Sequence, residues 1–250
     1  MNVESTYEPR AAVHAALGDP ARLAIVDALA LTDASPSELG RALGMPSNLL
    51  AHHLGVLQQA KVIVRGRSEA DRRRTYVGLA AAAIPYAVAD DVPEVLRRIV
   101  FICTHNSARS PLAAALWANR SDVPATSAGT HPASHVHREA VAAARRHGLE
   151  LRHARTAHVR DVLRTGDLVV AVCDGAYEEL AGREFAQLHW SVPDPARGRT
   201  ADAFDRAFES LDERVERLVT AVERRQRCDR TQPDPRAEHG ARVGGEPARR

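Results

Sequence analysis

The hydrophobic and polar positions of this 250-residue chain form two successive patterns. In the first, stretches with apolar residues at helical spacing are bounded by glycines and by Asp-Pro and Ser-Pro pairs, which are helix start and stop signals. They predict helices within 11–17, 21–31, 37–44 and 48–60. Alternating positions at 62–64 and 75–79 predict two strands around a polar turn. Short helices followed by a hairpin predict a winged helix-turn-helix over residues 1–83.

The second pattern begins at Arg97 and alternates strands with helices. Apolar runs predict strands at 97–103, 125–127 and 167–173 and near residue 189, with helices at 111–119, 138–147 and 177–181. A final amphipathic helix carries an apolar stripe from Phe204 to Val222. This alternation predicts an α/β fold with a doubly wound parallel sheet over residues 97–225. Residues 84–96, with two prolines and an acidic pair, are expected to be a linker, and residues 226–250 a disordered tail.

Composition narrows the class of protein. Apolar residues make up 44% of the chain, enough for most of it to fold around a core. The sequence has neither an apolar run of the roughly 18–20 residues that a membrane span needs nor an N-terminal secretory signal. Three cysteines without such a signal favour reduced thiols. We therefore expect a cytoplasmic protein with no membrane partner.

The net charge of +2 conceals a local basic cluster. Residues 61–74 contain six basic and two acidic side chains, although residues 1–96 as a whole carry a charge of −2. A basic cluster on a nearly neutral domain favours contact with nucleic-acid phosphates. A solvated, charged hairpin is the alternative interpretation.

The most informative stretch is Cys103-Thr104-His105-Asn106-Ser107-Ala108-Arg109-Ser110, between a predicted strand and a predicted helix. Backbone N–H groups of such a loop and the positive end of the helix bind a tetrahedral oxyanion, and the same field favours a thiolate at its start. Arg109 can donate two hydrogen bonds to oxyanion oxygens, and Ser110 can stabilise the Cys103 thiolate. Asn106 tolerates the left-handed backbone that a tight loop needs. The alternative is a buried cysteine in an ordinary loop.

Residues 97–223 resemble the low-molecular-weight tyrosine phosphatase fold in its arsenate reductase branch, through FICTHNSARSPLAAALW, ATSAGT, DLVVAVCD and HWSVPDPA. The resemblance implies that Cys103 is the nucleophile, that Thr104, His105, Asn106, Ser107, Ala108 and Ser110 surround the oxyanion, and that Asp194 is the general acid. It also implies that Cys173 is the resolving thiol of a reductase. Without the resemblance, Asp194 reads as a turn residue and Cys173 as a small buried residue of a strand.

The chain departs from thioredoxin-coupled reductases, in which a further cysteine follows the resolving one by about seven residues. Leu180 occupies that neighbourhood here. Either Cys228 substitutes, or an external thiol reductant such as mycothiol, glutathione or a thioredoxin system completes the cycle; we favour the external thiol. No bound cofactor is expected, and because the histidines repeat no ligand spacing, no metal is expected.

Three activities stay open for this domain. Thr104-His105-Asn106 and the lack of an aromatic residue after Asp194-Pro195 favour arsenate over phosphotyrosine as the substrate. A tyrosine phosphatase is the second reading, because Arg109-Ser110-Pro111 also fits that branch. A non-catalytic repressor that senses oxyanion or redox state is the third; the complete set of Cys103, Arg109 and Asp194 argues against it.

The first domain resembles ArsR-type winged-helix repressors over residues 7–80, through GDPARLAIVDALA, the run from SPSELG to VIVRGR, and RRRTYVGL. The resemblance implies a homodimer that binds operator DNA. The residues implied to contact DNA are Ser47, Asn48, His52 and His53 on the recognition helix, and Arg72, Arg73 and Arg74 in the wing. His52 and His53 are alternatively ordinary surface residues.

Residues 1–96 contain no cysteine, so this domain has no thiolate site for arsenite. We expect instead that oxyanion occupancy or thiol state in the second domain biases DNA binding. The alternative is two independent activities on one chain.

Overall fold

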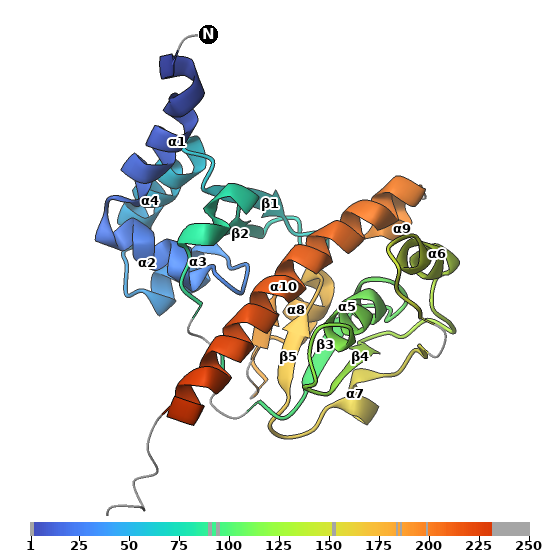
Figure 1. Ribbon diagram of the computed structural model, residues 1–250. Coiled ribbons are helices and arrows are strands. Elements are labelled where there is room, and N and C mark those ends of the chain that lie inside the picture. Colours follow the sequence, from blue (N-terminus) through green and yellow to red (C-terminus); the bar gives the residue numbers. More distant parts are fainter. Residues whose placement is uncertain are drawn as a thin grey trace, which may run out of the picture.

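The computed structural model describes residues 3–231 apart from 90–91, 94–95, 152–153, 184, 186 and 199. Two domains lie side by side, and the long C-terminal helix runs across the boundary between them (Figure 1). Across the described residues, no helix combines the length and apolar character that a membrane crossing requires.

The first domain is a helical cluster with an antiparallel hairpin. Its elements are α1 (Val3–Leu17), α2 (Pro20–Ala28), α3 (Pro36–Ala42), α4 (Ser47–Gln59), β1 (Ile63–Arg67), β2 (Thr75–Leu79) and the 3-10 helix η1 (Ala81–Tyr86). Asp19 caps α2 by accepting the Arg22 N–H, and Ser35 with Glu38 forms a capping box on α3. Leu54 and Leu57 of α4 are fully buried against α2. The winged helix-turn-helix is therefore confirmed.

The second domain is a parallel sheet with helices on its faces. Its elements are β3 (Ile99–Cys103), α5 (Arg109–Ala118), β4 (Ala125–Gly129), α6 (Arg138–Arg146), α7 (Val159–Val162), β5 (Leu168–Ala171), α8 (Asp174–Glu179), β6 (Gln187–His189), α9 (Pro195–Gly198) and α10 (Ala201–Thr231). The strand order is β4-β3-β5-β6, with every pairing parallel. This order confirms the predicted doubly wound α/β fold.

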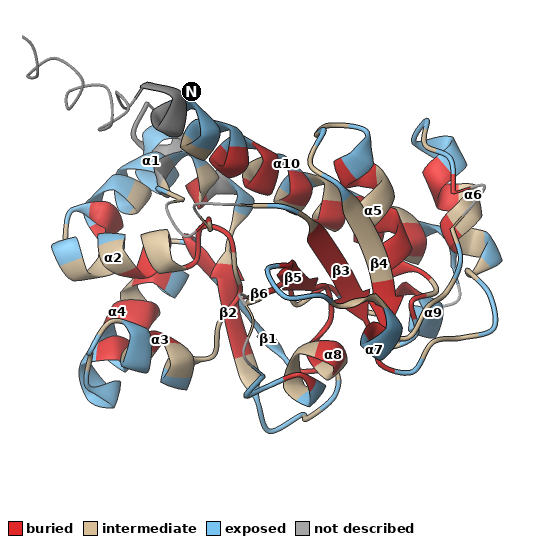
Figure 2. Cartoon of the chain, turned by 90° about the horizontal axis from the view of Figure 1, so that it is seen from below, coloured by how far each residue is buried: buried red, intermediate tan, exposed pale blue. Residues whose placement is uncertain are grey.

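The sheet forms the core of the second domain and fixes where its site lies. Every residue of β3 and β5 is buried (Figure 2). The chain reverses direction across the sheet at β3, which lies between β4 and β5. Ligands of open parallel sheets bind beyond the carboxyl ends of the strands at such a switch point. The segment that follows Cys103 occupies this position.

The structure differs from the sequence-based expectation at both ends. Helix α1 begins at Val3 rather than near residue 11. Residues 7–12 of this helix are exposed, Tyr7 among them, and therefore carry no apolar stripe that would predict a helix. Helix α10 continues to Thr231, so residues 226–231 are helical where a disordered tail was expected. Their charged sequence carries no helical periodicity to reveal them. Residues 232–250 of the expected tail, and four positions of the expected linker, lie outside the described residues.

The two domains share a polar interface centred on the segment between α2 and α3. Asp33 donates its N–H to the His189 carbonyl at 2.7 Å, and its carboxylate accepts from the Ser191 N–H at 2.7 Å. The same carboxylate accepts from Arg214 of α10 at 3.0 Å. The Trp190 indole donates to the Leu31 carbonyl at 2.8 Å. This segment therefore packs along β6, at the edge of the second domain's sheet.

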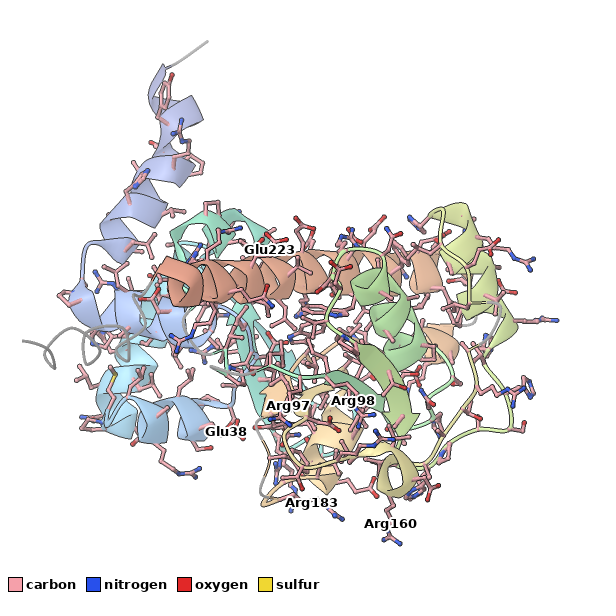
Figure 3. All side chains as sticks on the ribbon, turned by 60° about the horizontal axis from the view of Figure 1, so that its bottom comes forward. Glu38, Arg97, Arg98, Arg160, Arg183 and Glu223 are labelled. Atoms are coloured by element: carbon pink, nitrogen blue, oxygen red, sulfur yellow. The ribbon has the colours of Figure 1, made fainter. Side chains whose placement is uncertain are left out.

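The hairpin turn makes a second set of contacts across the boundary. We call residues 68–71 the wing tip. Its Ser68 hydroxyl donates to Glu178 of α8 at 2.7 Å, and the Glu69 N–H donates to Asp174 at 2.9 Å. Nearby, the Tyr177 hydroxyl donates to Glu38 of α3, which lies at the junction of the domains (Figure 3). The wing tip is thus held against the second domain rather than projecting into solvent.

Candidate active site

The segment between β3 and α5 forms a tight loop around the Cys103 sulfur. The Ser110 hydroxyl lies 3.0 Å from this sulfur, in position to donate to a thiolate. Asn106 adopts φ 48°, the left-handed backbone that its residue type led us to expect. Its side-chain amide donates to Ser110 and Ser127, and its oxygen accepts the Ala157 N–H at 2.8 Å. These bonds fix the loop in one shape.

Hydrogen bonding leaves the amides of this loop without acceptors. The carbonyls of Cys103, Thr104, His105 and Ser107 accept bonds from the segment 130–137. Among the described residues, by contrast, no acceptor receives the N–H groups of residues 104–108. Buried backbone donors are rarely left unpaired, and successive unpaired amides form an anion-binding concavity. An oxyanion with several acceptor oxygens would satisfy them.

Close packing against β4 supports the loop from below. A Cβ atom on Gly129 would lie 2.8 Å from the Thr104 carbonyl oxygen and 2.9 Å from the Asn106 nitrogen. Only glycine therefore allows the end of β4 to approach the loop this closely.

Arg109 supplies the positive charge of the site from the first position of α5. Its side chain is 6% exposed. One nitrogen, Nη1, donates to the Val192 carbonyl at 2.8 Å, and Nη2 lies 3.6 Å from the Asp194 carboxylate. Although burial opposes it, electrostatic attraction to the surrounding ionisable groups, namely Cys173, Cys103, Asp194 and Glu69, raises the pKa of Arg109 above its ordinary value. The cation is therefore permanent.

Cys173 lies two residues after β5, as the N-cap of α8 and beside the same loop. Its sulfur lies 3.5 Å from the Thr104 hydroxyl and accepts the Ala176 N–H at the start of α8. Burial raises the pKa of the Cys173 thiol, and this effect outweighs the opposing attraction of Arg109. A cavity of about 330 Å³ is lined by Thr104, His105, Arg109, Cys173 and Asp194, among others. The structure thus brings four of the expected loop and catalytic residues to one cavity, together with the expected acid.

Acidic residues that the sequence did not indicate also line this cavity. Glu69 of the wing tip accepts the Asp194 N–H at 2.9 Å and lies 3.5 Å from Arg109. Asp174 forms a buried pair with His189 at 3.0 Å. Although burial opposes it, the hydrogen bonds from His189 and from the Glu69 N–H lower the pKa of Asp174 below its ordinary value. In the sequence, Glu69 stands out only as an acidic residue within the basic stretch 61–74.

The expected DNA-binding residues are mostly exposed. Ser47, Asn48 and His52 lie on the solvent face of α4, and Arg72, Arg73 and Arg74 lie exposed beyond the wing tip. His53 is a correction, because it is buried, with Nδ1 3.9 Å from Asp19, and faces the core instead of a DNA groove. Its place three residues after Leu50, on the apolar side of α4, explains this.

Two family models match parts of the chain. The family model for low molecular weight phosphotyrosine protein phosphatase matches residues 98–228, and a helix-turn-helix domain model matches residues 17–65. No curated protein matches the chain.

Several solved structures resemble the second domain. Arsenate reductase from Archaeoglobus fulgidus is 27% identical, covers 49% of this chain and 98% of its own, and has a TM-score of 0.44. A YwlE mutant from Bacillus subtilis is 24% identical, with coverages of 50% and 98% and a TM-score of 0.46. The tyrosine phosphatase Wzb from Escherichia coli K30, in complex with sulphate, is 22% identical, with coverages of 51% and 99% and a TM-score of 0.47. Reductases and phosphatases both occur, so these likenesses do not distinguish the two activities.

Proposed function

The chain belongs to the low molecular weight phosphotyrosine protein phosphatase family, and we propose that it joins a thiol-dependent arsenate reductase to a DNA-binding regulator. In this proposal the substrate is arsenate, held by the free amides of residues 104–108 and by Arg109. Operator DNA is the ligand of the first domain, contacted by α4 and the wing arginines, with the chain as a homodimer.

The proposed reaction uses both thiols. The Cys103 thiolate attacks arsenic, and an As–O bond breaks as Asp194 protonates the departing oxygen. The Cys173 sulfur then attacks the Cys103 sulfur. A disulfide forms, and the electron pair of the S–As bond stays on arsenic, so As(V) becomes As(III) and arsenite leaves. Two thiols supply the two electrons. An external thiol, such as mycothiol, glutathione or a thioredoxin system, would reduce the disulfide again.

The position of Cys173 is the observation that favours a reductase over a phosphatase. Phosphatase chemistry needs the Cys103 loop, Arg109 and an acid, but no second thiol. Here a second thiol lines the cavity, at hydrogen-bond distance from the residue that follows the nucleophile. Its pKa is raised by burial, so it stays a thiol until a reaction needs it.

Single-turnover chemistry tests the proposal. Reduced protein freed of small thiols and mixed with arsenate should release about one arsenite and lose about two thiols per chain. Cys173→Ser should abolish both, whereas Cys228→Ser, a matched cysteine replacement, should change neither.

The same measurement separates the alternatives. Hydrolysis of p-nitrophenyl phosphate that survives Cys173→Ser, without arsenite from the unaltered chain, would make the protein a phosphatase. Oxyanion binding without turnover of either substrate would make it a sensor. A thiol loss that depends on Cys228 would assign the resolving step to that cysteine.

A raised pKa at Cys173 predicts a pH dependence of arsenite release. Only the thiolate attacks a sulfur, and a raised pKa moves the thiolate to higher pH. The resolving step should therefore accelerate with rising pH, by about tenfold per unit below the pKa of Cys173. Quenched-flow measurement of arsenite checks this. Hydrolysis of p-nitrophenyl phosphate by Cys173→Ser is the control, because it does not involve the resolving thiol; an identical pH profile there would contradict the prediction.

A further inference from the structure

The wing tip contributes a charged side chain to the cavity of the second domain. Ser68 and Glu69 anchor the tip on α8, through Glu178 and Asp174. The anchored backbone directs the Glu69 carboxylate at Arg109, 3.5 Å from Nη1. A carboxylate from the DNA-binding domain therefore already contacts the guanidinium that would hold a substrate oxyanion.

Among the carboxylates around the cavity, Glu69 is the one that we expect to compete with an anionic ligand for Arg109. Four carboxylates line the cavity: Glu69, Asp174, Glu179 and Asp194. Asp174 pairs with His189, and Glu179 lies 3.2 Å from His131. Asp194 lies 3.6 Å from Nη2 of the same guanidinium, but it is the acid of the proposed reaction. Glu69 has Arg109 as its cation, so an oxyanion on the loop and the Glu69 carboxylate would share one guanidinium.

We propose that Glu69 is a residue of the oxyanion site, supplied by the wing, and that its carboxylate competes with inorganic oxyanion for Arg109. Binding of arsenate or phosphate weakens the hold on the wing tip, and the docked wing tip weakens binding of the oxyanion by the same factor. The inference rests on the oxyanion-binding part of the proposed function, and not on which reaction follows.

Removal of the Glu69 charge tests the competition. Glu69→Gln keeps an oxygen that can accept the Asp194 N–H but loses the negative charge. We expect it to bind inorganic phosphate about tenfold more tightly than the unaltered chain in a calorimetric titration of the full-length reduced protein. The matched control is Asp71→Asn, which removes a carboxylate of the same turn that pairs with Arg73 instead. It should change the phosphate affinity by less than about twofold.

Hydrogen exchange gives an independent readout of the same competition. Phosphate should increase amide exchange across residues 67–71 in the unaltered chain. In Glu69→Gln this segment should exchange faster before phosphate is added, and phosphate should add little.

Three results would overturn the inference: equal or weaker phosphate binding by Glu69→Gln, an equal gain in Asp71→Asn, or wing exchange that ignores phosphate. Phosphate is not reduced, so a chain that binds it as expected yet releases no arsenite would refute the reductase and leave the inference standing. Failure of both proteins to bind phosphate would refute the oxyanion site and the inference together.

Discussion

Arg109→Lys should lower the rate of arsenite formation by about 1000-fold, the scale on which removal of a preorganised oxyanion donor acts. Lysine keeps the positive charge but loses the planar fork that donates two hydrogen bonds to one oxyanion. The Val192 carbonyl would also lose the 2.8 Å bond that orients the guanidinium. The single-turnover rate with arsenate measures the effect, and hydrolysis of p-nitrophenyl phosphate should fall in parallel.

A matched substitution distinguishes this loss from unfolding. Arg98→Lys changes another arginine, partly buried, that pairs with Asp167 at the opposite end of β3, away from the loop. It should leave the turnover rate within about twofold, because its ion pair plays no part at the cavity. An Arg109→Lys protein that keeps its circular dichroism and a rate within tenfold of the unaltered chain would contradict the role of the fork.

Asp33→Ala should destabilise the folded chain by about 3–5 kcal/mol, because removal of one partner of a buried ion pair leaves the other charge buried and unpaired. The Asp33 side chain is 8% exposed and that of Arg214 is 15% exposed. The substitution leaves both the Arg214 guanidinium and the Ser191 N–H without this acceptor. Gly78 packs directly against the carboxylate, so alanine also leaves a gap in the interface.

Denaturation in urea, followed by circular dichroism, measures this loss. Asp27→Ala is the matched control, since Asp27 accepts one exposed hydrogen bond from the Val88 N–H and lies outside the Asp33 cluster. Its expected cost is about 1 kcal/mol. Equal urea midpoints for the two variants would show that the Asp33 cluster contributes no more to stability than the single hydrogen bond of Asp27.

The loop and both folds could be predicted from the sequence because their signals are local. Cys103, Arg109 and Ser110 lie within eight consecutive residues, between a strand and a helix that each show their own periodicity. Helix caps at Asp19 and Ser35 also act over three residues. Local preferences of this kind agree with the final fold, so they can be recognised without knowledge of the tertiary contacts.

The acidic side of the cavity could not be predicted, because it depends on contacts between distant residues. Glu69 and Asp194 are 125 positions apart, and Asp174 and His189 meet only through the order of β5 and β6. The basic composition of residues 61–74 favoured DNA contact for the whole turn. Its arginines are exposed as that interpretation requires, but its tip packs on the other domain. His53 was misplaced because adjacent helical positions can lie on opposite sides of the apolar boundary.

The hydrogen bond from the Trp190 indole to the Leu31 carbonyl places a fluorescent side chain at the boundary between the domains. The chain has two tryptophans, and the other, Trp117, is buried beside β3 and donates to the Val123 carbonyl within its own domain. Separation of the domains should expose the Trp190 indole to water and leave the Trp117 indole buried. The emission spectrum of the unlabelled protein therefore contains both a reporter of domain separation and its internal reference.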